Sequence, residues 1–531
     1  MNVPLFAGLL LLPFSFARLD SAIALSDSIG EAGINARKLH EAPHTLTGRK
    51  VVLGQLEIGR PGQFGVDKTA VGNPPLNLAG VFFRNLPALP NLHVDNHAAM
   101  VAAVMVSYDK KLPGVAPHAR LFSSAVGTLS RSGQPEECLA AQHLAEQNNT
   151  QVRAINLSFG ESLERDPREH ASLDGNALLT QCLDWSAQHH NVLYVVAGNQ
   201  GQGGIPIPTD QFNGITTAYT AKRQRQFTKV DFANLSAKPM GVGRRLIRRE
   251  VNQGGRRGIS LLAPGHKISV RKLNGQVAQV SGTSFAAPHV TGSIALLQEF
   301  SDRKLQTADP NWSLSARRHE VMKAILLNAA EKLQDTGDGR RLGMNRTILD
   351  KHNRTWLQSD AFQNSRIPLD IQMGAGQLEI YRALKQYQSG PLPPSEGLPA
   401  RGWDYGTVDL ERSQDYSLER PLLQDSFFVA TLVWDRRVTL NDRNQNERYD
   451  LGETFKVGGL NDLNLYLLNT ESQELSQAVC RSDSLVDNVE HLFCPIPQTG
   501  RYKLRVVYAQ PAHELKQPYA IAWWGQAAST P

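Results

Sequence analysis

The chain has 531 residues, more than one compact domain usually holds, so at least two domains are expected. Apolar residues make up 41% and charged residues 20% of the chain, which excludes a disordered or membrane-embedded protein. The formal charge of +6 arises largely between Lys222 and Arg257, where eleven basic residues accompany two acidic ones. No aromatic interleaving and no nucleic-acid-reading motif accompanies this cluster. We therefore expect a solvated basic surface insertion and no nucleic-acid partner.

Residues 1–24 are typical of an export signal peptide. Residues 4–17 form an apolar run that is too short to cross a bilayer, and no later stretch is long enough either. Ala22-Ile23-Ala24 then supplies the small-x-small pattern of a cleavage site. We expect cleavage after Ala24, a secreted or periplasmic location and no membrane span.

The four cysteines are Cys138, Cys182, Cys480 and Cys494, and none belongs to a C-x-x-C pair. This spacing argues against a zinc ribbon or a thioredoxin-like site. In an exported protein such an even, sparse set predicts two disulfides. One would join Cys138 to Cys182 and the other Cys480 to Cys494, and the alternative is four buried free thiols.

Between residues 25 and 387, apolar β-branched runs alternate with helical patterns. Buried strands are predicted at 51–58, 152–157 and 192–197, and helices at 97–106, 135–147 and 285–300. Strand–helix alternation of this kind predicts an α/β domain with a mostly parallel sheet flanked by helices.

The hydrophobic pattern changes after a linker at residues 388–402, where prolines and glycines exclude continuous helix or strand. From residue 403 to residue 531 the period is two, as in the runs 463–467, 502–508 and 519–523. Short alternating strands separated by turn residues predict an antiparallel β-sandwich as the second domain.

The strongest chemical signal lies in residues 281–292, which read SGTSFAAPHVTG. A glycine-hinged turn leads into a helix of small residues. Ser284 would lie near the N-terminus of that helix, where backbone N–H groups and the helix dipole favour a developing negative charge. A serine alone is a weak nucleophile, so a base and an orienting group are needed from elsewhere in the chain.

This segment resembles the serine motif of the subtilisin-like serine peptidases, the subtilase family, and the resemblance extends along roughly residues 33–387. It implies the family's fold, hydrolysis of peptide bonds and Ser284 as the nucleophile. Residues 97–103, HAAMVAA, resemble the family's histidine motif and imply His97 as the general base. Ala98 and Ala99 replace the usual glycine and threonine there, and both are small enough for close helix packing.

Other segments match the same family. Residues 197–201, AGNQG, resemble its oxyanion segment and imply that Asn199 donates its side-chain amide to the tetrahedral oxyanion. In residues 155–160, Ser158, Phe159 and Gly160 resemble the edge that binds an extended substrate through backbone hydrogen bonds. Segments 321–332 and 374–384 resemble the family's closing helices.

The third member of the triad departs from the family pattern. The family has an aspartate at the end of the first strand, whereas residues 52–59 read VLGQLEIG and supply Glu57, which is one methylene longer. A carboxylate that ends a buried strand is suited to orient an imidazole and to stabilise its charged form, so we assign this role to Glu57. Asp95 is the competitor, although it lies only two residues before His97.

Residues 442–453 resemble a calcium loop. Oxygen-bearing side chains, which suit Ca²⁺, occupy five ligand positions: Asp442, Asn444, Asn446, Asp450 and Glu453. The sixth position, usually glycine, is Glu447. The two interpretations are a structural calcium ion and an ion-free polar loop, and the catalytic chemistry implied by the resemblance requires no cofactor.

Taken together, these features predict a secreted serine endopeptidase that acts as a monomer on polypeptide substrates through Ser284, His97 and Glu57. The alternative is a catalytically impaired protein of the same fold that binds extended peptides. A carbohydrate-binding or adhesive function would rest on the C-terminal sandwich alone, and a fold by itself does not establish a function.

Overall fold

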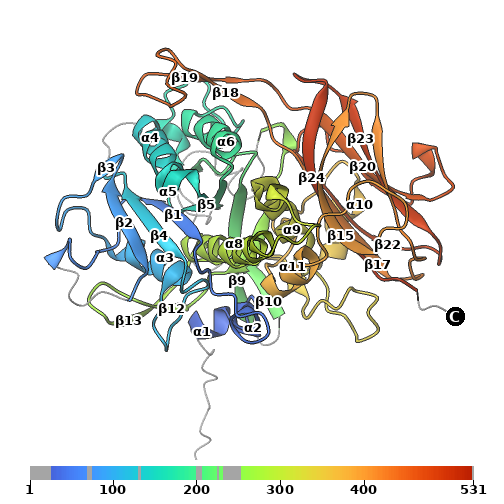
Figure 1. Cartoon of the computed structure of the whole chain (residues 1–531), viewed down its shortest axis with the longest axis horizontal. Helices are drawn as coiled ribbons and strands as arrows, with labels where there is room; N and C mark the ends of the chain where they lie inside the picture. The colour runs from blue at the N-terminus through green and yellow to red at the C-terminus, as the bar shows by residue number, and fades with distance from the viewer. Residues whose placement is uncertain are drawn as a thin grey trace, which may run out of the picture.

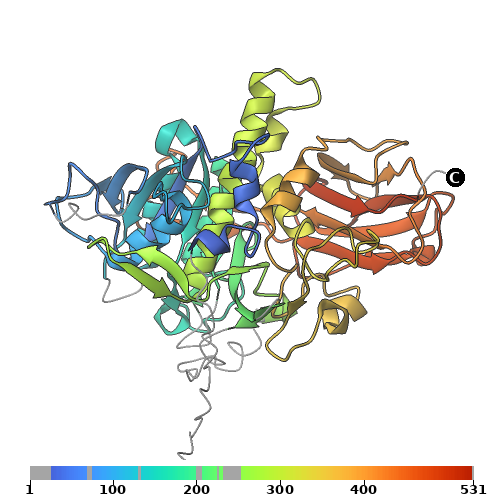
Figure 2. The same cartoon turned by 90° about the horizontal axis from the view of Figure 1, so that it is seen from below.

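The computed structural model of the chain describes residues 25–68, 75–128, 133–198, 206–223, 226–230 and 253–528. The predicted signal peptide, Asn199 and most of the basic stretch lie outside these residues. No helix within them is long and apolar enough to cross a membrane. A sheet flanked by helices forms one end of the molecule and antiparallel sheets form the other (Figures 1 and 2).

The first part contains a large sheet whose central strands pair in parallel. These strands are apolar runs buried on both faces, so helices must cover each face. Antiparallel pairing is confined to the pairs β2–β3 and β9–β10. The path of the sheet runs β14 (Ile348–Leu349), β10 (Gln226–Val230), β9 (Ile215–Arg223), β7 (Leu193–Ala197), β5 (Val152–Leu157), β1 (Val52–Glu57), β4 (Arg120–Ala125), β2 (Leu78–Phe83) and β3 (Leu86–Pro87), and β11 (Leu261–Pro264) pairs with β9.

Helices cover both faces of this sheet, as Figure 1 shows. Successive side chains of β5 enter different cores, since Ala154 packs with the buried residues of α3 and α8 while Ile155 packs with those of α4 and α6. The main helices are α3 (Asn96–Val106), α4 (Gln134–Ala145), α6 (Leu178–His190), α8 (Thr283–Gln306), α9 (His319–Asn328) and α11 (Ile380–Tyr387). Short elements complete this part: α1 (Leu25–Ser28), α2 (Ala36–His40), α5 (Gln147–Thr150), α10 (Asp360–Gln363), β6 (Glu161–Ser162), β8 (Pro206–Ile207), β12 (Ile268–Arg271) and β13 (Val277–Val280).

Two four-stranded antiparallel sheets form the second part, which we call the C-terminal sandwich. Residues of both sheets, among them Leu432, Leu504 and Trp523, fill one shared core, so the sheets pack face to face. The first sheet runs β15 (Arg401–Asp409), β24 (Lys516–Gly525), β17 (Phe427–Val433) and β22 (Val489–Pro495). The second runs β16 (Ser413–Ser417), β23 (Tyr502–Gln510), β20 (Asp462–Asn469) and β21 (Cys480–Ser482).

A two-stranded hairpin leaves the sandwich and lies against α4 and α6 at the top of Figure 1. Its strands are β18 (Val438–Asn441) and β19 (Thr454–Val457). Tyr449, between the two strands, is 1% exposed, and its backbone N–H donates to Gln142 Oε1 of α4 at 2.6 Å. We call residues 438–457 the hairpin arm, because it carries the C-terminal half of the chain onto the helices of the large sheet.

Both predicted disulfides form, and none of the four cysteines is free. The Cys138–Cys182 bond joins α4 to α6 beneath the hairpin arm, in a cluster that includes Trp185 and Tyr449. The Cys480–Cys494 bond joins β21 to β22. Disulfides persist in oxidising compartments, so the pair is typical of an exported protein.

The predicted α/β fold and the antiparallel second part are confirmed, with two local corrections. The expected helix at 374–384 is wrong in its first half, because helix α11 begins only at Ile380. Gly374 and Gly376 have φ angles of 56° and 121°, and Gln377 pairs with strand residues on both sides. The expected solvation of the basic stretch is also wrong at its ends, since Lys229 is fully buried and Arg256 is 7% exposed.

Candidate active site

Three of the strands that end side by side bring the predicted site residues together. Glu57 is the last residue of β1, Ser158 directly follows β5, and Gly198 directly follows β7. The register pairs Leu56 with Leu157, and Leu157 with Val196, so the three ends are level. Since these strands are parallel, their carboxyl ends lie at one edge of the sheet, which is where ligands bind in open α/β folds.

Ser284 is the second residue of α8, and three hydrogen bonds fix its helix to the ends of β5 and β7. Its Oγ donates to the carbonyl oxygen of Ser158 at 3.2 Å, and the Ser158 hydroxyl donates back to the Ser284 carbonyl at 2.9 Å. The Thr283 hydroxyl donates to the carbonyl oxygen of Gly198 at 2.9 Å. The side chain of Ser284 is therefore located at the carboxyl edge of the sheet, within the first turn of a long helix.

A tight turn aims α8 at this edge. Gly282 precedes the helix with φ of 146°, a backbone conformation that disfavours other residues. Its N–H donates to the carbonyl oxygen of Gly265 at 2.8 Å. A Cβ atom on Gly265 would lie 2.7 Å from the Gly282 carbonyl oxygen and 2.5 Å from Cβ of Tyr219, so this close approach requires glycine.

His97 lies in the first turn of α3, and its ring meets both the serine helix and the end of β1. The ring contacts Phe285, the neighbour of Ser284, edge to face at 5.6 Å between centroids. Its Nδ1 lies 3.4 Å from Oε2 of Glu57. The His97 side chain is 40% exposed whereas that of Glu57 is 2% exposed, so the ring opens to solvent while its carboxylate partner is buried.

The pKa of His97 is raised by this arrangement. Burial on its own lowers the pKa, but the Glu57 charge and hydrogen bond, helped by the charge of Asp95, outweigh burial and lift the pKa above its ordinary value of 6.5. A carboxylate that favours the imidazolium is the electrostatic contribution expected of a triad's third member.

Asp95, the competing carboxylate, has a different contact. It is the N-cap of α3, where its Oδ1 accepts from the backbone N–H of Ala98 at 3.0 Å. Because this hydrogen bond satisfies one of the free N–H groups of the first turn, Asp95 fixes the start of the helix that carries His97.

The predicted substrate edge lies beside Ser284. Ser158 is buried, Phe159 is partly buried and Gly160 is exposed, so the edge opens progressively with distance from the serine. Asn199, predicted to bind the oxyanion, lies outside the described residues. Its neighbour Gly198 holds the serine helix through Thr283 and donates its N–H to the carbonyl oxygen of Thr217 at 2.7 Å.

Two supporting residues were missed by sequence reasoning. The Asn156 side chain donates to Ser158 Oγ at 2.9 Å and accepts from the Thr291 hydroxyl of α8 at 3.3 Å. It thereby links the substrate edge to the serine helix. Thr283 anchors the helix start to Gly198. A polar residue within an otherwise apolar strand, as in INLS, was the available signal for Asn156.

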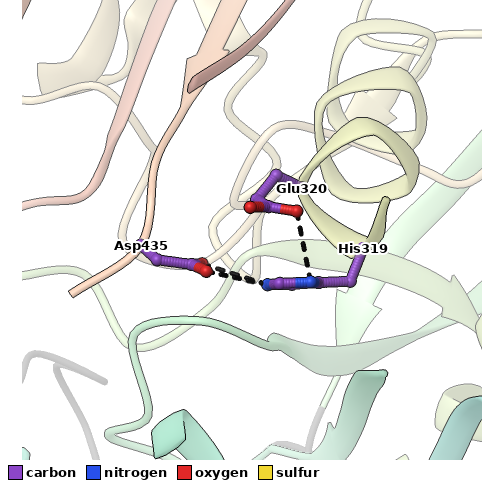
Figure 3. Close-up of side chains that lie close together, drawn as sticks. All are labelled: His319, Glu320 and Asp435. Carbon is purple, nitrogen blue, oxygen red and sulfur yellow. Dashed lines mark hydrogen bonds and ion pairs between the residues drawn. The ribbon is translucent and has the colours of Figure 1, made fainter. Parts of the chain in front are cut away.

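A second cluster of titratable groups lies between α9 and the C-terminal sandwich (Figure 3). The fully buried His319 ring contacts Glu320 through Nδ1 at 3.2 Å and Asp435 through Nε2 at 3.1 Å. Among the described residues this is the one His and carboxylate group compact enough to hold a metal ion. Arg318 already pairs with Glu320 at 2.6 Å, so an imidazolium and a guanidinium balance the two carboxylates without a metal.

The predicted calcium ligands lie in the hairpin arm. The amide nitrogens of Asn444 and Asn446 each lie 2.8 Å from Oδ2 of Asp450. The Asp442 carboxylate accepts the backbone N–H groups of Gln445 and Glu447, both at 2.7 Å. The remaining candidate, Glu453, accepts from backbone N–H groups at both ends of the loop.

Comparison with known proteins identifies the class of this fold and site. The model of the Subtilase family (Peptidase_S8) matches residues 86–344. The chain therefore contains a domain of the subtilase family, the subtilisin-like serine peptidases. Ser284, His97 and Ser158 lie within the matched residues, and Glu57 precedes them.

Individual relatives share between a fifth and a third of their residues with the chain. It is 28% identical over 270 residues to Subtilisin Savinase of Lederbergia lenta, covering 50% of this chain and 81% of that protein. It is 28% identical over 270 residues to an alkaline protease of Alkalihalobacillus alcalophilus, of which it spans 57%. The structure of the prenylagaramide maturation protease PagA is 19% identical with a TM-score of 0.41, covering 66% of this chain and 98% of that one.

Proposed function

We propose that the chain is a serine endopeptidase that hydrolyses peptide bonds with Glu57 as the third member of its triad. The observation that carries the proposal is the 3.4 Å contact between Glu57 Oε2 and His97 Nδ1, on a ring that also packs against the serine helix. With Nδ1 directed to the carboxylate, Nε2 is the nitrogen available to accept the serine proton.

In the proposed mechanism, the Ser284 hydroxyl rotates away from the Ser158 carbonyl and donates its proton to His97 as it attacks the substrate carbonyl. The imidazolium formed is stabilised by Glu57 and returns the proton to the leaving amine. The backbone N–H of Ser284 and the side chain of Asn199 would hold the oxyanion, and no cofactor takes part. An extended peptide would pair with Ser158–Gly160.

The second candidate is a non-catalytic protein that binds extended peptides at the same edge. The observation in its favour is the Ser284 hydroxyl, which donates to a backbone carbonyl at 3.2 Å. Against it stands the raised pKa of His97, which a pure binding site does not require. Rotation of one serine side chain separates the two arrangements, and such rotation is available between staggered wells.

Labelling with a fluorophosphonate separates the two candidates. We expect the secreted protein to be labelled and Ser284→Ala to remain unlabelled, since only an activated serine reacts. Cleavage of a denatured protein should be lost with the label. A folded protein that binds peptides but takes no label would overturn the endopeptidase proposal.

We further propose that residues 1–24 are a signal peptide, that 25–387 form the peptidase domain, that 388–402 are the connecting linker, and that 403–531 form the second domain. The two disulfides support export. Burial of Ser28 and Ile29 supports cleavage before them, since both are fully buried. The N-terminal sequence of the secreted protein tests the cleavage site, and a first residue beyond Ile29 would contradict it.

We also propose that the loop 442–453 binds a structural Ca²⁺ ion. The amides of Asn444 and Asn446 converge on Asp450, and a half-turn of each amide would present oxygen instead of nitrogen to the same point. Glu447 adopts φ of 60° at the position where such loops usually have glycine. Titration calorimetry with Ca²⁺ should show binding that Asp450→Asn weakens, and absence of heat would contradict this proposal.

A further inference from the structure

A pocket with a volume of about 320 Å³ opens between the first turns of α4 and α6. Three separate segments line it: the start of each helix, the connection 166–176 and strand β19 of the hairpin arm. Partly exposed apolar side chains form much of its wall, namely Pro135, Leu178 and Phe455. The pocket is thus assembled jointly by the subtilase domain and by the C-terminal half of the chain.

Topology places this pocket at the edge of the sheet where the candidate active site lies. In a parallel sheet the connecting helices run back along the strands, so α4 and α6 begin near the carboxyl ends that carry Glu57 and Ser158. A direct contact confirms the proximity. Glu161, which follows Gly160 of the substrate edge, accepts a hydrogen bond from the backbone N–H of Gly133, the neighbour of Gln134 in the pocket wall.

The charges around the pocket are already neutralised. Arg168, the one cation that lines it, donates to Asp166 through Nε at 2.9 Å and to Asp174 through a terminal nitrogen at 2.8 Å. Its remaining terminal nitrogen donates to the carbonyl oxygen of Ser172 at 3.0 Å. A guanidinium held in this way has little capacity left for an acidic ligand, so the wall favours an uncharged, apolar one.

Gln134 supplies a free donor in the wall. Its side chain is 1% exposed, and its Oε1 accepts from the backbone N–H of Leu179 at 3.0 Å, which fixes the orientation of the amide. Within the described part of the chain its Nε2 has no hydrogen-bond partner. A buried donor without a partner is costly, and the carbonyl oxygen of a peptide would satisfy it.

We propose that this pocket binds an apolar side chain of the polypeptide substrate, with Gln134 Nε2 donating to the substrate backbone. The proposal rests on the proposed peptidase function and adds a substrate subsite that the hairpin arm completes. A peptide that pairs with Ser158–Gly160 and continues past Gly160 advances about 3.3 Å per residue, so roughly the fourth to sixth residues on the acyl side of the scissile bond reach the pocket.

Two series of quenched fluorescent peptides test the subsite. One has three residues on the acyl side, and the other is extended with a Leu or Gln placed in turn at the fourth, fifth and sixth positions. We expect Leu to raise kcat/KM about tenfold over Gln at one position, the scale for burying an apolar side chain, and to act mainly through KM. Extension on the leaving-group side should have no such effect.

Variants of the arm assign the effect to the pocket. Phe455→Ala and Thr454→Trp, which remove an apolar wall and fill the pocket from an exposed position, should abolish the Leu preference and leave short-peptide turnover unchanged. Leu440→Ala, a matched change on β18 outside the pocket lining, should keep the preference. Gln134→Leu should weaken binding of every extended peptide alike, whichever residue is scanned.

The affinities of the same peptides for Ser284→Ala, measured by fluorescence anisotropy, give a readout that does not depend on turnover. Preference for Leu in binding supports the pocket even if the wild-type protein fails to cleave, which would contradict the proposed peptidase function alone. Equal affinities for Leu and Gln peptides at all three positions would overturn the subsite, as would a preference that survives both Phe455→Ala and Thr454→Trp.

Discussion

His97 and Glu57 lie 3.4 Å apart from Nδ1 to Oε2, although they come from a helix and a strand separated by forty residues. Two hydrogen bonds set this contact from opposite sides. Val126 N–H donates to the Glu57 carbonyl oxygen at 2.9 Å and fixes the strand end, while the Asp95 cap fixes the start of α3. A longer carboxylate than the family's aspartate is therefore accommodated by the backbone on both sides.

Glu57→Gln should lower kcat by about 10³–10⁴, the effect of neutralising the carboxylate of a serine triad. The pH profile supplies a second test. The base must be neutral to act, so wild-type activity should rise through a pKa above 6.5, and removal of the Glu57 charge should move this rise to lower pH. Steady-state kinetics between pH 5 and pH 9 measure both effects.

Asp95→Asn is the matched control for this prediction. Asparagine caps a helix as well as aspartate does, so the substitution removes a charge near His97 and preserves the start of α3. We expect a smaller downward shift of the same limb and little loss of kcat. A larger loss of kcat in Asp95→Asn than in Glu57→Gln would exchange the roles assigned to the two carboxylates.

The catalytic segments could be predicted from the sequence because their signals are local. Residues 281–292 carry their own hinge, helix start and nucleophile, and a buried run that ends in a charge, as β1 does, identifies Glu57 without any partner. The start of α11 could not be predicted in the same way. Glu379 caps that helix only because Gln377 is drawn into pairing with Leu262, which lies far away in sequence.

The contacts between the two halves were the other feature that sequence reasoning missed. Asp435 meets His319 across 116 positions, and Tyr449 meets Gln142 across 307. Neither contact leaves a periodic signal, because each depends on where the sandwich is placed against the helices. The alternation that predicts β20 and β23 describes only the core within the sandwich.

Stability should depend on pH through His319. Burial lowers its pKa, but Asp435 and Glu320 outweigh burial and the Arg318 charge, so the pKa in the folded protein lies above 6.5. A group with a raised folded pKa stabilises the protein below its unfolded pKa, and this contribution is lost as pH rises through the folded value. Chemical unfolding at a series of pH values above 6 should show that decline.

Asp435→Asn tests the origin of that decline. Breaking a buried ion pair by removing one partner costs about 3–5 kcal/mol, so the free energy of unfolding should fall at pH 6. The difference from wild type should shrink as pH rises and His319 loses its proton. A constant difference across the range would show that the imidazolium does not contribute, leaving only the lost packing and hydrogen bonding.

The N-terminal segment should contribute to the stability of the serine helix. The Ser28 hydroxyl and Nε2 of His289 are 2.8 Å apart and buried, and His289 lies one turn beyond Ser284. Ser28→Ala leaves that ring nitrogen without this contact, and an unsatisfied buried group costs about 1–3 kcal/mol. Urea unfolding should show a loss of this size, whereas Ser413→Ala on an exposed strand position should show none.

The disulfide beneath the hairpin arm should matter more than the one in the sandwich. Cys138 and Cys182 close a loop of 44 residues and Cys480 and Cys494 one of 14, and loop-closure entropy predicts about 4 and about 3 kcal/mol respectively. Replacing Cys138 and Cys182 together by alanine also opens the cluster around Trp185 and Tyr449 on which the arm rests. The free energy of unfolding should therefore fall further for this pair than for the Cys480/Cys494 pair, and limited proteolysis should cut first within residues 438–457. Equal losses, with an arm that stays protected, would show that the arm is held without the disulfide.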